Sequence, residues 1–108
     1  MVSEVELREQ KEKFKQLISY RDMVLRLQKN PDFQNLILKY WCVEECARYV
    51  QASGDINLPE ENRKQALEMA LATGHFKRFL DVVIRMGDHA ESQMESLDTA
   101  ITESLDEE

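Results

Sequence analysis

The chain has 108 residues, carries 14 Lys+Arg against 21 Asp+Glu for a formal charge of -7, and contains only 3 Gly and 2 Pro. That length supports one modest core, and 43% hydrophobic residues with so little Gly and Pro favour a single all-α domain over a disordered or an all-β chain. No apolar run is long enough to span a bilayer and the first residues lack the apolar stretch of a secretion signal, so we expect a soluble protein of a reducing compartment.

The first predicted helix covers about residues 4–29. Ser3 and Glu6 have the spacing of a capping box, in which each side chain satisfies a free backbone N–H at the start of a helix. Apolar residues then recur at helical spacing, but residues 8–13 are wholly polar. The first half of this helix is therefore poorly supplied with core residues.

A second helix is predicted over residues 31–52. Asn30 is placed to cap it and Pro31 suits its first position. Apolar side chains recur at steps of three and four: Phe33, Leu36, Tyr40, Val43, Ala47 and Val50. Further apolar residues widen this arc, namely Ile37, Leu38, Trp41, Cys42, Cys46 and Tyr49, so we expect burial on most sides. Gly54 is expected to end the helix in the left-handed conformation.

Two more helices are predicted, over residues 59–73 and 75–103, with Gly74 ending or kinking the chain between them. Gly87 lies inside the last helix and marks a close backbone approach, a bend or a tolerated weak position. The acidic end, about residues 96–108, is expected to fray because the helix dipole disfavours carboxylates there. The sequence thus predicts about four helices in a hairpin or bundle, with the first and last helices long.

The negative charge is concentrated at the end of the chain. Residues 86–108 hold eight carboxylates and no Lys or Arg. Nucleic-acid phosphates and anionic membrane surfaces both attract basic rather than acidic faces. Direct nucleic-acid binding and membrane binding are therefore not expected.

The long outer helices outreach the shorter inner ones, so their ends need cover from each other or from another molecule. Three apolar residues of the last helix form either core against the first helix or an oligomer face: Met94, Leu97 and Ile101. Basic and acidic residues share complementary helix faces, which either attract each other or are solvated separately: Arg8, Lys11 and Lys15, and Glu91, Glu95 and Asp98. Tyr40 and Trp41 are either core residues or anchors for a partner.

The side chains that could carry chemistry do not form a recognisable site. Cys42 and Cys46 lie one helical turn apart, but a closed zinc site needs four ligands and neither His75 nor His89 has a suitable spacing. The glutamate pairs have basic neighbours in helical register, and three isolated glycines cannot build a phosphate-binding loop. We therefore expect no catalytic, cofactor-binding or metal-binding residues and no enzyme activity.

Several segments resemble small acidic helical proteins encoded by tailed bacteriophages, over about residues 25–95. The likeness is carried by Asn30-Pro31-Asp32-Phe33, Leu36-Ile37-Leu38, Glu44-Glu45-Cys46-Ala47-Arg48 and Phe79-Leu80-Asp81-Val82-Val83-Ile84-Arg85-Met86-Gly87. The resemblance implies a virion or morphogenesis component, or another phage accessory protein, made in the bacterial cytoplasm. It carries over no functional residue.

Two functions are consistent with these patterns. The first is a homo-oligomeric structural or assembly protein that acts through helix–helix contacts, with itself or another phage protein as partner. The alternative is an acidic inhibitor that mimics nucleic acid and occupies a basic groove of a host or phage protein. The first hypothesis places the interface on the first helix and the distal half of the last.

Overall fold

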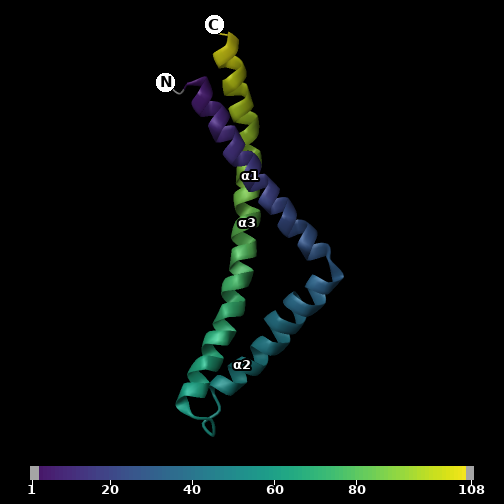
Figure 1. Ribbon diagram of the computed structural model, residues 1–108, viewed down its shortest axis with the longest axis vertical. Coiled ribbons are helices and arrows are strands. Elements are labelled where there is room, and N and C mark those ends of the chain that lie inside the picture. The colour runs from purple at the N-terminus through teal and green to yellow at the C-terminus, as the bar shows by residue number, and fades with distance from the viewer. Residues whose placement is uncertain (1–2, 107–108) are drawn as a thin grey trace. The chain divides into compact units, whose positions relative to one another are not determined.

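The computed structural model describes residues 3–106 and places almost all of them in helices (Figure 1). Helix α1 spans Glu4–Lys29 and the last helix, α3, spans Glu60–Asp106. Between them lie η1, a π-helix over Phe33–Glu45, and α2, over Cys46–Ser53, which follow each other without a break. Residues 3–106 contain no strand. The all-α prediction with long first and last helices is confirmed.

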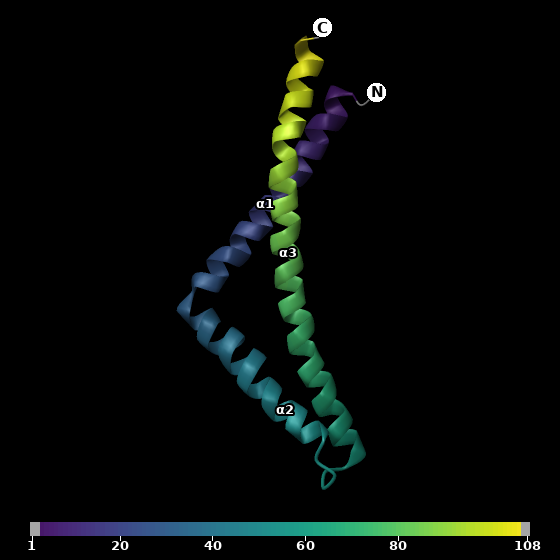
Figure 2. The same ribbon diagram turned by 180° about the vertical axis from the view of Figure 1, so that it is seen from behind.

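The prediction of about four helices is wrong, because α3 is one helix of 47 residues through Gly74. Figure 2 shows it running without interruption through the position where a break was expected. Gly74 is exposed, whereas Thr73 is 2% exposed and Phe76 contacts aromatic rings of η1. A glycine inside a helix costs roughly 1 kcal/mol relative to alanine. Packing on both sides of Gly74 outweighs that small cost.

Side-chain hydrogen bonds explain where α1 begins and where the helical segment that follows it begins. The Ser3 hydroxyl accepts a hydrogen bond from the backbone N–H of Glu6 at 3.2 Å, as the capping box predicts for that group. The side chain of Asn30 accepts hydrogen bonds from the N–H groups of Asp32 and Phe33, at 2.9 and 3.2 Å. Asn30 therefore caps the second helical run, as predicted.

Gly54 follows α2 as expected, but its backbone differs from the prediction. Its φ is -99° and its ψ is 0°, which is right-handed rather than left-handed. The chain turns instead through hydrogen bonds from the N–H groups of Gly54 and Asp55 to the carbonyls of Gln51 and Ala52, both at 3.2 Å. No left-handed residue is required to end this helix.

The π-helical turns of η1 change which residues are buried. Side chains with little exposure recur at every fourth position: Phe33, Ile37, Trp41, Glu45 and Tyr49, with Leu38, Cys42 and Cys46 beside them. In an α-helix, residues four apart rotate by about 40° relative to each other, because one turn has 3.6 residues. The wider i→i+5 turn rotates less per residue, so the packed face of η1 departs from the three-and-four spacing of an α-helix.

The burial expected on most sides of this helix is therefore wrong. Four residues of the predicted stripe are exposed: Leu36 60%, Tyr40 49%, Val43 57% and Val50 52%. Of the predicted stripe only Phe33 lies on the inner face, together with the residues that were predicted to widen the arc and with Glu45. The three-and-four spacing belongs to the outer surface, because the packed face follows a period of four.

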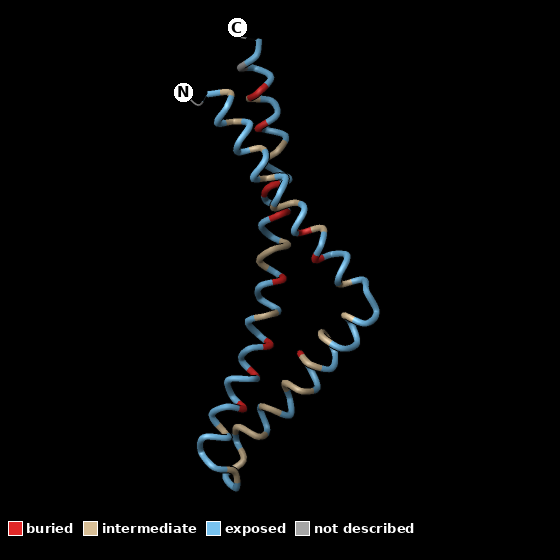
Figure 3. Tube along the Cα trace, in the orientation of Figure 1, coloured by how far each residue is buried: buried red, intermediate tan, exposed pale blue. Residues whose placement is uncertain are grey.

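Packing divides the chain into two compact units. The first comprises residues 1–25 and 82–108, of which 3–25 and 82–106 are described, and we call it the hairpin unit. The second comprises residues 26–81, with the end of α1, η1, α2 and the first part of α3. Figure 3 shows buried positions in both units.

The second unit packs η1 and α2 against the first part of α3. The ring of Phe76 lies 6.3 Å from Phe33 and 5.4 Å from Trp41, centroid to centroid, both in tilted arrangements. Small residues of α3 allow close approach, with Ala66 and Ala70 both 8% exposed. The Cys46 thiol donates a hydrogen bond to the carbonyl of Ala70 at 3.8 Å. This contact joins α2 and α3 directly.

Candidate interface on the hairpin unit

The hairpin unit is an antiparallel pair of helical segments. Lys11 pairs with Asp98 and Arg21 pairs with Asp88, so ten residues forward on α1 correspond to ten residues backward on α3. On α3 the inward positions alternate in steps of three and four: Val83, Gly87, Ala90, Met94, Leu97 and Ile101. That spacing is the repeat of a coiled-coil seam. The two segments lie side by side in both Figure 1 and Figure 2.

The matching seam of α1 contains two cations. Its less exposed positions follow the same alternating steps: Leu7, Lys11, Phe14, Ile18 and Arg21. Lys11 reaches Asp98 at 2.6 Å, and Arg21 reaches Asp88 at 2.9 Å and Glu91 at 2.6 Å. Polar residues at seam positions specify the register of a helix pair at some cost in stability. The two cations therefore fix how α1 aligns with α3.

Arg21 is the most enclosed charge of the hairpin unit, at 8% exposure. Its guanidinium donates hydrogen bonds to Glu91, Asp88 and Asp22. The bonds to Glu91 and then Asp88 raise the pKa of Arg21 above its usual value, so the side chain stays charged throughout the ordinary pH range. Sequence analysis missed this residue, although its seven-residue distance from Phe14 was a usable signal.

The complementary basic and acidic helix faces predicted from the sequence form ion pairs with each other within one chain, but only some of their residues do so. Lys11 pairs with Asp98, as complementary faces would require. Arg8 instead pairs with Glu4 at 2.9 Å and Lys15 pairs with Glu12 at 3.3 Å, both on α1. Glu91 is bound by Arg21, a residue outside the predicted stripe.

The apolar candidates of the distal helix are covered within the chain. Leu97 and Ile101 are 7% and 8% exposed, and Met94 is half-buried. These side chains lie on the inward seam of α3, which α1 covers. Of the two interpretations left open by the sequence, the structure shows core at Leu97 and Ile101. Residues 96–106, where fraying was expected, are helical, and residues 107–108 lie outside the described residues.

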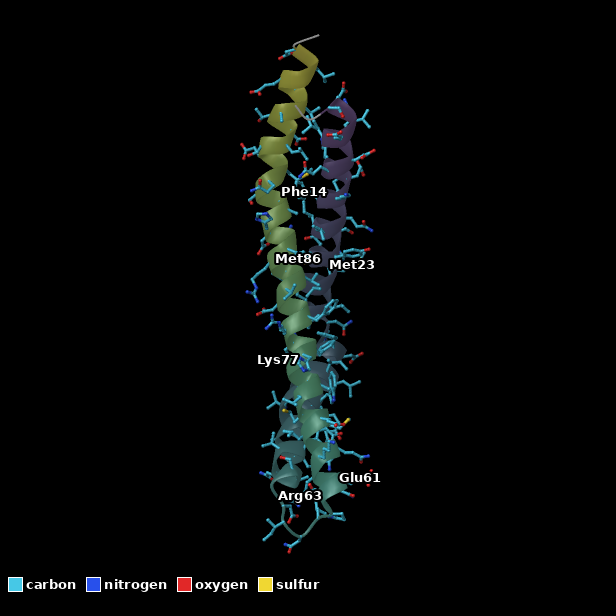
Figure 4. All side chains as sticks on the ribbon, turned by 90° about the vertical axis from the view of Figure 1, so that its left-hand side faces the viewer. Phe14, Met23, Glu61, Arg63, Lys77 and Met86 are labelled. Carbon is cyan, nitrogen blue, oxygen red and sulfur yellow. The ribbon has the colours of Figure 1, made fainter. Side chains whose placement is uncertain are left out.

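Two shallow grooves of opposite charge remain on the surface of this unit. The α1 groove is lined by Glu12, Lys13, Lys15, Gln16, Ser19, Tyr20 and Met23. The α3 groove is lined by Glu91, Met94, Glu95, Asp98, Thr99, Thr102 and Glu103. Tyr20 is 46% and Met23 45% exposed, and Figure 4 labels Met23 on α1. Each groove thus combines charge of one predominant sign with apolar side-chain surface.

Some charged side chains of the two grooves are neutralised by ion pairs within the chain, and others are not. In the α3 groove, Glu91 and Asp98 are neutralised by Arg21 and Lys11. Among residues 3–106, Glu95 and Glu103 form no ion pair, and neither does Lys13 of the α1 groove. Glu95 and Lys13 therefore keep their charges for other contacts.

Tyr40 and Trp41 have different surroundings despite being neighbours. Tyr40 is on the outer face of η1 and is half exposed. Trp41 is less exposed and lies against the ring of Phe76. The structure places Trp41 in the packing of the second unit and leaves Tyr40 accessible.

The thiols and the charged pairs of the second unit form no reactive centre. Burial raises the pKa of the Cys42 thiol, which keeps it in its unreactive protonated form. Arg48 hydrogen-bonds Glu45 and lowers the pKa of that carboxyl group.

Within residues 3–106 no three His, Cys, Asp or Glu side chains gather as metal ligands would. None of the described helices is both long and apolar enough to cross a membrane.

Comparison with protein-family models, with curated proteins and with solved structures gives no significant match to this chain.

Proposed function

We propose that this is a non-enzymatic, homo-oligomeric structural or assembly protein that acts through helix–helix contacts. The observation that carries the proposal is the pair of oppositely charged grooves on one hairpin unit. A unit that carries both complementary grooves can bind a second copy of itself about a two-fold axis, with each contact made twice. The resemblance over residues 25–95 supports a role in a bacteriophage virion or its morphogenesis, in the bacterial host cytoplasm.

In the proposed dimer the α1 groove of each copy faces the α3 groove of the other. Tyr20 and Met23 would pack on Met94 and on the threonine methyl groups, and Lys13 and Lys15 would meet Glu95 and Glu103. Two hairpins joined in this way bring four helical segments together. Exposed ion pairs contribute only about 0–1 kcal/mol each, so the apolar residues supply affinity and the charges supply orientation.

The interface differs from the one expected from sequence. Lys11, Glu91 and Asp98 hold the hairpin together, so reversing their charges would disturb the fold. Lys13, Lys15, Glu95 and Glu103 are the better residues to change, because all four are exposed.

Exchange of these charges tests the dimer. We expect Lys13→Glu with Lys15→Glu to weaken self-association roughly tenfold, through repulsion from the α3 groove. Adding Glu95→Lys and Glu103→Lys to the same chain should restore most of it, because both grooves are then reversed. Sedimentation velocity over a concentration series measures the association.

A matched control reverses two exposed charges of the second unit, Lys39→Glu with Lys64→Glu. This variant has the same net charge as the Lys13/Lys15 variant and should associate like the wild type. A wild-type protein that sediments as a monomer at high micromolar concentration would contradict the proposal. So would equal weakening by the control.

An acidic inhibitor is the second candidate, because four carboxylates and no basic residue line the α3 groove. Two of the four, Glu91 and Asp98, are already bound to cations of α1. A mimic of nucleic acid needs an extended array of carboxylates that are free to meet a basic groove. The assembly function is therefore the better supported proposal, because it uses both grooves of the hairpin unit, whereas an inhibitor would use only the carboxylates of the α3 groove that are not bound to cations.

A further inference from the structure

A third hollow lies on the second unit. It is lined by Gln28, Leu38, Lys77, Arg78, Leu80 and Asp81, and we call it the Lys77 hollow. Leu80 is 6% exposed and Leu38 is half-buried, so both contribute apolar lining. Lys77 and Arg78 are exposed, and Figure 4 labels Lys77 on α3. Asp81 already has an interaction partner in the chain. The hollow thus offers apolar surface together with two accessible cations.

The end of α3 has the opposite character. Leu105 is 45% exposed, and Glu103 and Asp106 on either side of it are exposed carboxylates. The last turn of α3 contains no basic residue, whereas the last turn of α1 contains Arg26 and Lys29. The helix dipole makes carboxylates unfavourable at a helix C-terminus and cations favourable. Residues 103–106 thus combine an exposed leucine with two exposed carboxylates and no cation.

We propose that the end of α3, residues 103–106, of one copy docks into the Lys77 hollow of a second copy. Leu105 would contact Leu38 and Leu80. Lys77 and Arg78 would meet the two carboxylates. The occupant is a second copy, because residues 103–106 supply the carboxylates and the exposed leucine that complement the two cations and the apolar lining of the hollow.

This contact rests on the proposed function, since it requires that copies of the chain associate, and it adds a second kind of contact. The two-fold contact between hairpins is closed. The docking of an α3 end into a hollow joins different surfaces of the two copies, so it can repeat from copy to copy. The protein would therefore form dimers through one contact and longer assemblies through the other.

Mixing a variant of the α3 end with a variant of the hollow distinguishes a head-to-tail contact from a two-fold contact. Leu105→Ser removes the apolar anchor and Arg78→Glu reverses a cation of the hollow, and we expect each to weaken head-to-tail association roughly tenfold. An equimolar mixture of the two variants should regain pairing, because one supplies an intact hollow and the other an intact end. The mixture should not grow beyond single head-to-tail pairs. Both variants are made in the Lys13→Glu/Lys15→Glu background and followed by light scattering and sedimentation velocity.

Two controls on α3 match these changes. Lys64→Glu reverses an exposed charge and Leu71→Ser removes a leucine that is 53% exposed, both away from the hollow. Neither should change the assembly. Sole Trp41 lies against Phe76, next to Lys77, so its fluorescence should shift when the hollow is filled at high protein concentration and should stay constant in Leu105→Ser.

Failure of this contact can be separated from failure of the two-fold dimer. If Leu105→Ser and Arg78→Glu assemble like their controls, or if their mixture regains nothing, the head-to-tail contact is wrong even where the groove variants behave as proposed. If the groove variants have no effect but the mixing result holds, the two-fold dimer is wrong and head-to-tail association stands.

Discussion

At the scale of single residues, Gly87 and Arg21 mark a close approach of α1 and α3. A Cβ added to Gly87 would lie 2.2 Å from the Cβ of Arg21 and 2.9 Å from its Cγ and Cδ. These are atoms near the backbone of α1, so they cannot move aside as the tip of a flexible side chain can. The absence of a side chain at residue 87 lets Arg21 lie over α3 and reach Asp88 and Glu91.

The substitution Gly87→Ala should therefore destabilise the protein. The helix propensity of alanine favours the change by up to about 1 kcal/mol, but forcing α1 away from α3 costs roughly 1–3 kcal/mol and also disturbs the ion pairs of Arg21. We expect a lower free energy of unfolding in urea and a lower Tm by circular dichroism. An unchanged or higher Tm would show that α1 does not pack closely on Gly87.

Of the alternatives that the sequence left open at Gly87, the structure thus supports close approach. The sequence could not decide among them, because a glycine inside a helix has the same local pattern whether it is packed or exposed. The answer depends on Arg21, which lies far away in sequence. Lys11 and Arg21 were hard to recognise as seam residues for the same reason: cations occupy positions where apolar residues are expected, and only the partner carboxylates of α3 explain them.

At the scale of elements, local sequence signals predicted where a helix begins better than they predicted whether it continues. Asn30 and Ser3 act through hydrogen bonds within three residues, and both caps were predictable. Gly74 was expected to break a helix, but the packing of Thr73 and Phe76 within the second unit decides the outcome. The inner face of η1 also follows long-range packing, so the three-and-four pattern of its sequence indicated the wrong face.

The exposed glycine of α3 gives a prediction opposite to that for Gly87. A Cβ added to Gly74 would meet no atom within 4 Å, and its backbone is helical. Gly74→Ala should therefore stabilise the protein by roughly 0.5–1 kcal/mol, because alanine loses less conformational entropy in a helix. Thermal and urea unfolding of Gly74→Ala and Gly87→Ala should shift in opposite directions. A lower stability of Gly74→Ala would indicate that α3 bends at this position.

At the scale of the whole molecule, the first and last described residues of the chain both belong to the hairpin unit. In the hairpin unit, residues close to both termini form the seam, from Leu7 on α1 to Ile101 on α3. A chain whose ends are structural does not tolerate truncation as a chain with loose tails does. Charge composition alone suggested the reverse for residues 96–108, because it indicates repulsion and fraying but does not show the buried Leu97 and Ile101.

Deletion of residues 96–108 tests whether this acidic end is structural. It removes Leu97, Ile101 and Asp98, the partner of Lys11, and burial of one large aliphatic side chain contributes about 1.5–3 kcal/mol. We expect far-UV circular dichroism to lose more helix than the thirteen deleted residues account for, because the first turns of α1 lose their cover. Trp41 belongs to the second unit, so its emission should change little. Deletion of residues 104–108 alone keeps all three side chains and should preserve the helix of α1. If the longer deletion lost only its own helix, α1 would not depend on the end of α3 for its structure.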